Sequence, residues 1–573
     1  GRVLRRAGYD GVYGEIRLFR PEEVEGPGGT QALFASPAPA PAPRQPSQHD
    51  RAAPAAPPPA PPPADDRSGP DELDPDQRAA VATSCGALLV VAGPGTGKTR
   101  LLTHLIADRV NNQGLGPERC LAVTFTRRAC AELRERLSAL LPRDFERVLV
   151  TTFGGLGLQL VREQAGRLGV GPAAQVLDDP ARLELVTELT GGSARQARQA
   201  AGQISERKRQ RARHASELAG HPPPPDDDLL VRYEAALAAR GVVDLDDLSA
   251  LPVQLLAHDA RLAAEYRDRW QLVCVDEYQD LDDLQYHLVR LIAGSDVPPG
   301  LPAGEPPGGA GSGQPKRQLC AIGDPDQAIY GFRGGDVGHF LRFREDFPDT
   351  MEGELTRNYR STPTIVAAAL QAVAPSTLAP ERTLAAVDAT DDGPVVVHLA
   401  RDEREEALFV ADTIERMLGG SSFATLDRGG ADSSLRPRLS FSDFAVLYRT
   451  GAEAEPVAEA LARRGFPCRV RSHERLVDQP GVRAVLGAFR EIVEADVERP
   501  VPELLEDAVR RAAAGGVRSF DAPSPDDLAT AVELLAPLAV DCGADLRRFQ
   551  SEVTLGAGVD AWDRRADLIS LLT

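Results

Sequence analysis

The sequence predicts an α/β protein with mostly parallel sheets, and two observations support this prediction. Short apolar stretches typical of buried strands recur along the chain, and charged stretches of helical length separate them. Strands that alternate with helices favour parallel order, because a parallel neighbour needs a crossover connection. The strongest strand candidates are 87–92, 120–125, 147–153, 272–277 and 318–323, and GPVVVHLA (393–400) and FAVLYRT (444–450) are candidates later in the chain.

Length and composition limit the class of protein. A chain of 573 residues is too long for one compact domain and should hold about three or four. The net charge of −20 argues against a generally basic nucleic-acid-binding protein, although a local groove can still be basic. Seven cysteines without a CxxC pair favour a reducing compartment, and we expect a cytoplasmic protein without membrane spans, disulfides or zinc. Cys274 and Cys320 lie in apolar runs, so we expect them to be buried thiols.

Changes in composition divide the chain into segments. Because it begins with Gly1 rather than Met, we expect a part of a longer protein. The expected segments are the tail of an upstream domain (1–25), a disordered Pro/Ala-rich linker (26–70), a first α/β domain (71–157 and 246–350), a helical insertion within it (158–245), a second α/β domain (351–494) and the start of a second helical insertion (495–573).

The stretch AGPGTGKT (92–99) follows a predicted strand and precedes a predicted helix. This is the context of a phosphate-binding loop, in which backbone N–H groups and a helix N-terminus hold phosphates. Lys98 is one of three lysines in a chain whose basic residues are nearly all arginine, and its compact ammonium suits the β- and γ-phosphates. Thr99 is placed to reach Mg²⁺. The expected nucleotide-binding residues here are Ala92, Gly93, Pro94, Gly95, Thr96, Gly97, Lys98, Thr99 and Arg100.

The second candidate element is VCVDEYQD (273–280), an apolar strand that ends in two carboxylates. Parallel sheets place their sites at the carboxyl ends of strands. Asp276 would hold Mg²⁺, and Glu277 would orient and activate the attacking water. The alternative is that the acidic strand end only caps a helix. Because a phosphate loop precedes it in the chain, we favour the metal and catalytic roles.

Two further stretches carry candidate residues. In AIGDPDQAIYGFRGGD (321–336), Gln327 is placed to sense the γ-phosphate, and Tyr330, Phe332 and Arg333 can offer ring faces and a cation to nucleic acid. Phe332 has the alternative of anchoring its loop in a core. In LTRNYRST (355–362), Tyr359 could stack on adenine and Arg360 could reach the γ-phosphate.

Together and in this order, these stretches resemble the superfamily 1 DNA helicases of the UvrD/Rep/PcrA type over roughly 71–490. A phosphate loop that starts with Ala is usual in that family. The resemblance implies ATP and Mg²⁺ as cofactors, single-stranded and duplex DNA as partners, 3′→5′ movement and a role in DNA repair. It also implies two RecA-like domains, each interrupted by a helical insertion. Two later family motifs are not found before Thr573, so we expect the second domain to be incomplete.

The resemblance also implies roles for single residues. Gln77 would contact adenine; its alternative is to close a helix-capping box with Asp74, and we favour adenine. Phe125, Thr126 and Arg127 would contact single-stranded DNA, as would Thr152 and Phe153. Here the family usually has His after Phe, but this chain has Gly154.

Some features leave alternatives open. The run ISERKRQRARH (204–214) holds five basic residues against one acidic residue and could be a solvated helix face or a contact with duplex DNA. GYDGVYGEIRLF (8–19) has strand or hairpin character and weakly resembles the end of PHP-type nucleases related to endonuclease Q. Besides a helicase, the nucleotide motifs could serve a nucleotide-gated DNA-binding scaffold that does not unwind, or a small-molecule kinase or transport ATPase.

Overall fold

The computed structural model describes residues 73–84, 86–171, 174–217, 228–294, 317–331, 334–390, 393–418, 439–468, 479–493, 499–514 and 523–555, with three short strands before residue 33. The chain forms two compact units. We call residues 63–361, 376–388 and 475–573 the sheet unit, and residues 1–62, 362–375 and 389–474 the small unit. Each unit is considered by itself below.

A six-stranded parallel sheet forms the centre of the sheet unit and confirms the predicted α/β class. Each neighbouring pair is in parallel register. Every strand predicted in this half of the chain is present. In spatial order the strands are β11 (Thr350–Leu355), β4 (Ala87–Ala92), β10 (Gln318–Gly323), β9 (Leu272–Val275), β5 (Cys120–Thr124) and β6 (Leu149–Thr152).

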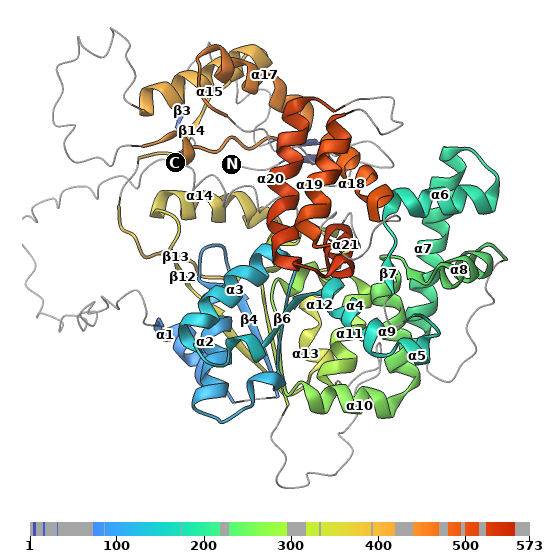
Figure 1. The fold of residues 1–573 in the computed structure, drawn as a ribbon. Helices are drawn as coiled ribbons and strands as arrows, with labels where there is room; N and C mark the ends of the chain where they lie inside the picture. Colours follow the sequence, from blue (N-terminus) through green and yellow to red (C-terminus); the bar gives the residue numbers. More distant parts are fainter. Residues whose placement is uncertain are drawn as a thin grey trace, which may run out of the picture. The chain divides into compact units, whose positions relative to one another are not determined.

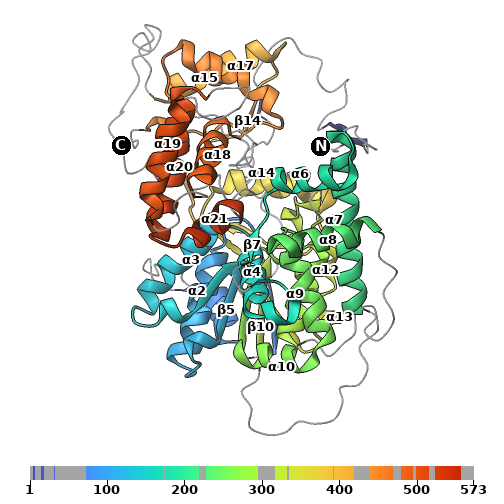
Figure 2. The same cartoon turned by 45° about the vertical axis from the view of Figure 1, so that its right-hand side comes forward.

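Helices cover both faces of this sheet, so its four central strands are apolar on both sides, while the edge strands β11 and β6 carry polar residues. One face packs against α1 (Pro75–Ala82), α2 (Lys98–Asn111) and α3 (Arg127–Leu140). The other packs against α4 (Phe153–Glu163), α9 (Asp247–His258), α10 (Ala260–Arg269), α11 (Asp283–Ala293), α12 (Gly338–Leu341) and α13 (Phe343–Asp346). Figures 1 and 2 show α1–α3 in blue and α9–α11 in green on opposite sides of the strands.

The strand β11 corrects one expected domain boundary. We expected the second α/β domain to begin at residue 351, but β11 pairs with β4 over six residues, from Thr350↔Ala87 to Leu355↔Ala92. The strand therefore completes the edge of the first sheet. The segment that follows it, β12 (Arg357–Asn358), pairs with β13 (Ala385–Ala386) and also belongs to the sheet unit.

Helices dominate the expected insertion at 158–245. Its main helices are α6 (Asp179–Thr190), α7 (Ala194–Glu217) and α8 (Asp228–Arg240), which share an apolar core; the short helix α5 (Ala165–Leu168) precedes them. The two-residue strands β7 (Gln175–Val176) and β8 (Val242–Val243) pair in parallel and bring the ends of the segment together.

The basic run of α7 pairs mainly with carboxylates of the same unit. Arg209 lies 3.6 Å from Asp246, Arg211 pairs with Glu234, and Arg213 lies 2.5 Å from Asp283. Together with Lys208, four of its five basic side chains are thus engaged within the protein. This pairing reduces the positive charge available to DNA. The run is therefore neither a purely solvated helix face nor a free basic patch.

Lys208 is the centre of a buried ionic network. Its Nζ atom lies 2.9 Å from Asp244 and 2.7 Å from Asp247, and the residue is fully buried. The hydroxyl of Tyr233 donates to Asp244. Burial works against the ammonium charge, but the two carboxylates outweigh it and raise the pKa of Lys208. The network joins α7 of the insertion to α9 beneath the sheet.

A second group of helices follows in the last hundred residues. The helices α18 (Pro480–Val493), α19 (Val501–Ala513), α20 (Pro525–Cys542) and α21 (Leu546–Leu555) share one apolar core around Phe489 and Phe549. This agrees with the helical reading of 495–573. Helix α21 reaches other parts of the sheet unit, since Gln175 donates to Gln550.

The small unit is mainly helical where the structure describes it. Helices α15 (Glu403–Met417) and α17 (Gly451–Arg463) pack together over Phe444 and Val446, and α14 (Pro363–Val373) precedes them. The strands expected at 393–400 and 444–450 are reduced, in the described residues, to β14 (Val396–Val397), which pairs with β3 (Gln31–Ala32). Strands β1 (Leu4–Arg6) and β2 (Glu15–Arg17) pair antiparallel; β2 lies within 8–19, where strand or hairpin character was expected, and β1 precedes that stretch.

Other expectations fall partly outside the described residues. Apart from β3, the linker at 26–70 lies outside them. The buried state expected for Cys274 and Cys320 is confirmed, since both are fully buried. Among the described helices, none combines the length and apolarity that crossing a membrane requires.

The Lys208 network predicts a large loss of stability when its cation is removed. Replacing Lys208 with Met leaves Asp247 buried without its counter-ion and leaves Asp244 only the more distant Arg182, at 3.7 Å, which should cost about 3–5 kcal/mol of folding free energy. Urea unfolding of the variant and the parent measures this difference. Arg198→Ala, on an exposed position of the same helix, is the control and should change stability by less than about 0.5 kcal/mol. A Lys208→Met variant as stable as the control would contradict the structural role of the network.

Candidate active site

The phosphate-binding loop joins β4 to α2, as predicted. Gly95 and Gly97 adopt left-handed φ values of 69° and 83°. A Cβ atom on Gly97 would lie 2.7 Å from Gln77 Nε2, so glycine is required for both conformation and space. Helix α2 begins at Lys98 without a side-chain cap, which leaves its first N–H groups available to an anion. Thr99 and Arg100 lie half-buried in the first turn of α2.

The acidic pair lies at the end of β9, beside this loop. Lys98 Nζ and Glu277 Oε1 are 3.2 Å apart, so the two strand ends meet through an ion pair. Glu277 is the one described residue other than glycine with a positive φ, at 50°. Such strained backbone is typical of functional positions. Gln279 Nε2 donates to the second Glu277 oxygen over 2.9 Å and orients the carboxylate.

The environment of Asp276 suits a divalent cation. The residue is 5% exposed, and Thr124 donates to its carboxylate. Burial raises the pKa of Asp276 to about 7, and the Glu277 charge adds to this effect while Lys98 opposes it. A nearby cation would stabilise the ionised form of this buried carboxylate. Together with the Thr99 hydroxyl, it supplies the oxygen ligands that Mg²⁺ prefers, so these residues fit the expected metal.

Gln327 lies at the end of β10, in the short helix η5 (Pro325–Gln327). Its Nε2 atom donates to Asp324 over 2.6 Å. Gln279 accepts a hydrogen bond from the Asp324 N–H, so Gln279 connects Glu277 with the Gln327 segment. Sequence reasoning gave no role to Gln279 or Asp324. The available signal was their position in the sequence: Gln279 lies two residues after Glu277, and Asp324 lies three residues before Gln327.

The contacts of Gln77 differ from the favoured prediction, which was contact with adenine. The capping box with Asp74 is complete: Gln77 N–H donates to Asp74 over 2.8 Å, and the Gln77 Oε1 atom accepts from the Asp74 N–H. Gln77 Nε2 donates to the Thr96 carbonyl, and the side chain is buried. Because both ends of the amide are engaged, the structure supports the capping alternative. Contact with adenine stays a prediction.

Tyr359 and Arg360 lie against the phosphate loop. The Tyr359 hydroxyl donates to Asp74 over 2.7 Å, and the Tyr359 N–H donates to the Gly95 carbonyl. The Arg360 Cβ atom is 2.6 Å from the place a Cβ on Gly95 would occupy. Both side chains are exposed. The structure thus brings these two predicted residues to the loop from a segment more than 250 positions later in the chain.

Two of the predicted DNA-binding aromatic residues form a pair. The rings of Phe125 and Tyr330 stack with centroids 5.4 Å apart and an interplanar angle of 22°. Both are half-buried, at the carboxyl ends of β5 and β10. Phe332 and Arg333 lie outside the described residues. Aromatic ring faces are groups on which bases stack, so this pair stays a candidate for contact with nucleic acid.

Four other predicted DNA contacts have defined partners or surroundings. Thr126 and Thr152 cap the helices α3 and α4 by accepting from backbone N–H groups. Each hydroxyl keeps its own proton for another acceptor. Arg127 lies 2.9 Å from Glu552 of helix α21. The ring of Phe153 is 4% exposed within the core under the sheet, so the structure does not support its expected contact with DNA.

The nucleotide and aromatic sites are connected through the residues after Glu277. Burial raises the pKa of the Asp280 carboxyl to about 6; the Glu277 charge adds to this rise, and the nearby backbone of Ile329 and Tyr330 opposes it. A Cβ on Gly335 would lie 2.9 Å from the Asp280 carbonyl, so the aromatic loop packs tightly on this segment. The Asp336 N–H donates to Leu281.

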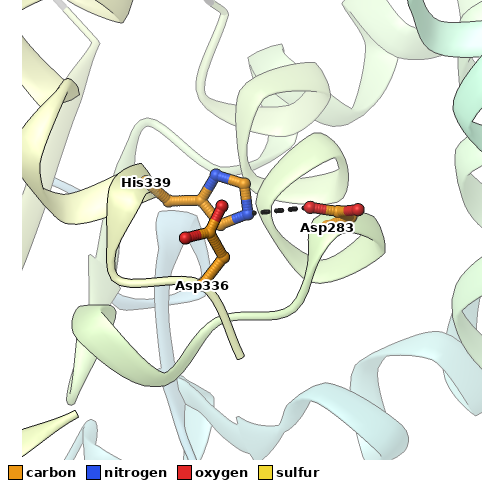
Figure 3. Close-up of side chains that lie close together, drawn as sticks. All are labelled: Asp283, Asp336 and His339. Carbon is orange, nitrogen blue, oxygen red and sulfur yellow. Dashed lines mark hydrogen bonds and ion pairs between the residues drawn. The ribbon is translucent and has the colours of Figure 1, made fainter. Parts of the chain in front are cut away.

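A cluster of Asp283, Asp336 and His339 completes this connection (Figure 3). His339 Nε2 and Asp283 Oδ1 are 3.1 Å apart, and His339 Nδ1 accepts from Arg342. Asp336 accepts from the Gly338 N–H. Because both ring nitrogens already have partners, the cluster serves as a hydrogen-bonded joint between α11 and the aromatic loop rather than as a metal site.

Comparison with known proteins agrees with this geometry. The family model of the UvrD/REP helicase N-terminal domain matches residues 73–348, and that of the UvrD-like helicase C-terminal domain matches residues 354–518. The ATP-dependent DNA helicase UvrD1 of Mycobacterium tuberculosis is 34% identical over 434 residues, covering 73% of this chain and 52% of the relative.

Two further relatives carry the name ATP-dependent DNA helicase PcrA. The protein from Leuconostoc citreum is 31% identical, covering 68% of this chain and 48% of the relative. The protein from Staphylococcus aureus is 27% identical, covering 74% of this chain and 54% of the relative. The chain thus spans about half the length of the curated relatives it matches. From these matches and the nucleotide site, the chain belongs to the UvrD/REP helicase family.

Proposed function

We propose that this chain acts as an ATP-dependent DNA translocase and helicase. The observation that carries the proposal is the meeting of Lys98, Glu277 and the Gln327 segment at one edge of a parallel sheet, next to the stacked pair of Phe125 and Tyr330. A phosphate-binding site and a base-stacking surface on the same strand ends can couple nucleotide turnover to movement along a nucleic acid.

Each nucleotide-site residue has a distinct task in this proposal. Lys98 and the first N–H groups of α2 bind the β- and γ-phosphates. The γ-phosphate attracts Lys98 away from Glu277, whose carboxylate then orients the attacking water and accepts its proton. Gln327 donates to the γ-phosphate, and Arg360 adds positive charge as the phosphoryl group leaves. Mg²⁺, held by Thr99 and Asp276, would neutralise phosphate charge when bound.

The DNA side follows from the contacts of Asp280. The aromatic loop packs on this segment: the Asp336 N–H donates to the Leu281 carbonyl, and a Cβ on Gly335 would lie 2.9 Å from the Asp280 carbonyl, three residues from Glu277. A shift of the Glu277 segment on hydrolysis would therefore move the aromatic loop and the base stacked on it. Single-stranded DNA would run across the two RecA-like domains, with duplex DNA ahead of it. The 3′→5′ direction, the repair role and a cytoplasmic location rest on the family resemblance.

Two other functions use the same nucleotide motifs. A DNA-binding scaffold gated by nucleotide would not need Glu277 in a strained and oriented position, so the positive φ of this residue favours turnover. A small-molecule kinase or transport ATPase would not need the stacked aromatic pair. These alternatives differ in how their ATPase rate responds to DNA.

The test of the proposal is the ATPase rate with and without single-stranded DNA. We expect a marked increase with DNA, because base stacking at Tyr330 is linked to Glu277 through Asp280. A kinase or transport ATPase would show no such increase. The Lys98→Ala variant controls for contaminating activity and should lose about 100-fold or more of the rate in both conditions, because it removes a donor to the transferring phosphate. A parent rate that DNA leaves unchanged would overturn the proposal.

Glu277→Gln should separate nucleotide binding from hydrolysis. The amide keeps the shape of the side chain but cannot accept the proton from water, so kcat should fall by about 10²–10⁴-fold. Binding of a fluorescent ATP analogue with Mg²⁺ should stay within a few-fold of the parent. Glu345→Gln, at an exposed position of α13, is the matched control. Loss of nucleotide binding in Glu277→Gln would show that Glu277 is structural.

Tyr330→Ala should weaken binding of single-stranded DNA. Loss of one stacking ring costs about 1–3 kcal/mol, and Phe125 would also lose its stacking partner. Fluorescence anisotropy with a labelled oligonucleotide measures the change, and Tyr330→Phe should bind like the parent because it keeps the ring. Equal affinity of Tyr330→Ala and the parent would assign the aromatic pair to packing alone.

A further inference from the structure

A segment outside the predicted motifs lies against the nucleotide site. We call residues 377–387 the strap. At its start, the Thr377 hydroxyl and the Leu378 N–H both donate to Asp326, over 2.7 and 2.6 Å. At its end, β13 pairs with β12, next to Tyr359. The strap is therefore hydrogen-bonded to the two segments that carry the expected γ-phosphate contacts.

Arg382 is the one charged residue of the strap whose side chain forms buried ion pairs in the described structure. Its side chain is 6% exposed. The guanidinium binds both oxygens of Asp324, with Nη1 at 3.0 Å from Oδ2, and Nη2 also lies 2.7 Å from Asp326. This fork geometry is one that arginine, and not lysine, can supply.

The same arginine lies close to the phosphate-binding loop. A Cβ atom placed on Gly93 would be 3.7 Å from Arg382 Nη1 and 3.4 Å from the Leu384 side chain. Gly93 is the second residue of the loop. Arg382 thus lies between the loop and the Gln327 segment, although nothing in its own sequence context, APERTLAA, predicted a site residue.

Asp324 contacts both Arg382 and Gln327 and so connects the two side chains. Its carboxylate is fully buried and accepts from Gln327 Nε2 over 2.6 Å, while its backbone N–H is held by Gln279. An amide NH₂ group has two protons. One can stay on Asp324 while the other reaches a phosphate oxygen, provided that Asp324 remains an acceptor.

We propose that Arg382 is a positioning residue for Gln327, and that through Asp324 it gives the site its preference for ATP over ADP. The inference rests on the proposed role of Gln327 as γ-phosphate donor. Without the guanidinium, the buried Asp324 carboxylate loses the two donors that help to fix its plane. The Gln327 amide then loses its fixed acceptor, so its second N–H is no longer held toward the phosphate.

The experiment measures binding of ADP and of a non-hydrolysable ATP analogue by the full 573-residue chain with Mg²⁺. For Arg382→Ala, the preference for the ATP analogue should fall by about tenfold, the equivalent of one charge-assisted hydrogen bond. ADP affinity should stay within about threefold, because the phosphate loop is intact. Arg382→Lys keeps the charge but loses the fork and should fall between Arg382→Ala and the parent. Glu381→Ala, at the exposed neighbouring position, should bind both nucleotides like the parent.

A double-variant cycle distinguishes positioning from a general structural role. Gln327→Ala should lower the same preference, and adding Arg382→Ala to it should lower the preference no further. Additive losses, or a lower melting temperature with an unchanged preference in both Arg382 variants, would overturn the inference while leaving the nucleotide site intact. A parent chain that binds neither nucleotide would overturn the proposed function itself, and this inference with it.

Discussion

The ion pair between Lys98 and Glu277 connects the two strand ends on which the candidate site depends. Lys98 starts the helix after β4, and Glu277 follows β9 with a strained backbone. Parallel order brings these ends to one edge of the sheet, although the residues are far apart in sequence. In the described structure the Lys98 ammonium pairs with the Glu277 carboxylate. The phosphate of a bound nucleotide would therefore compete with this carboxylate for the ammonium.

From this pair, a continuous set of hydrogen bonds extends in two directions. Gln279 connects Glu277 to Asp324, and Asp324 holds Gln327. Asp280 and Leu281 connect the same segment to the aromatic loop through close backbone contacts with Gly335 and Asp336. The residues proposed to bind nucleotide and the aromatic pair proposed to contact bases are therefore neighbours in the structure. This arrangement explains how one strand end can influence both the chemistry and the DNA contact.

Local patterns predicted much of this structure. The phosphate loop and the acidic strand end depend on residues within a few positions of one another, and each appears where its pattern indicated. The capping box of Asp74 and Gln77 is equally local, but it was the alternative that we did not favour. The stretch LTRNYRST suggested nucleotide contacts for Tyr359 and Arg360, but sequence spacing alone could not place them beside the phosphate loop. The stacking of Phe125 on Tyr330 likewise depends on the order of strands in the sheet.

Predictions that depended on distant partners were less successful. The charge of Lys208 in its own window suggested an exposed helix face, but its partners Asp244 and Asp247 are more than thirty positions away. Phe153 matched a DNA-contacting segment, yet its ring fills the core beneath the sheet. Arg382 had no motif at all. Its position depends on the chain folding back onto Asp324, which is distant in the sequence, and only the three-dimensional structure shows this contact.

The most direct test of this account is an experimental structure of the chain with a non-hydrolysable ATP analogue and Mg²⁺. The account predicts that Lys98 Nζ leaves its position 3.2 Å from Glu277 and contacts the β- and γ-phosphates, while Glu277 faces the γ-phosphate with room for a water molecule. A nucleotide-bound structure in which Lys98 remains paired with Glu277 and does not touch phosphate would contradict it.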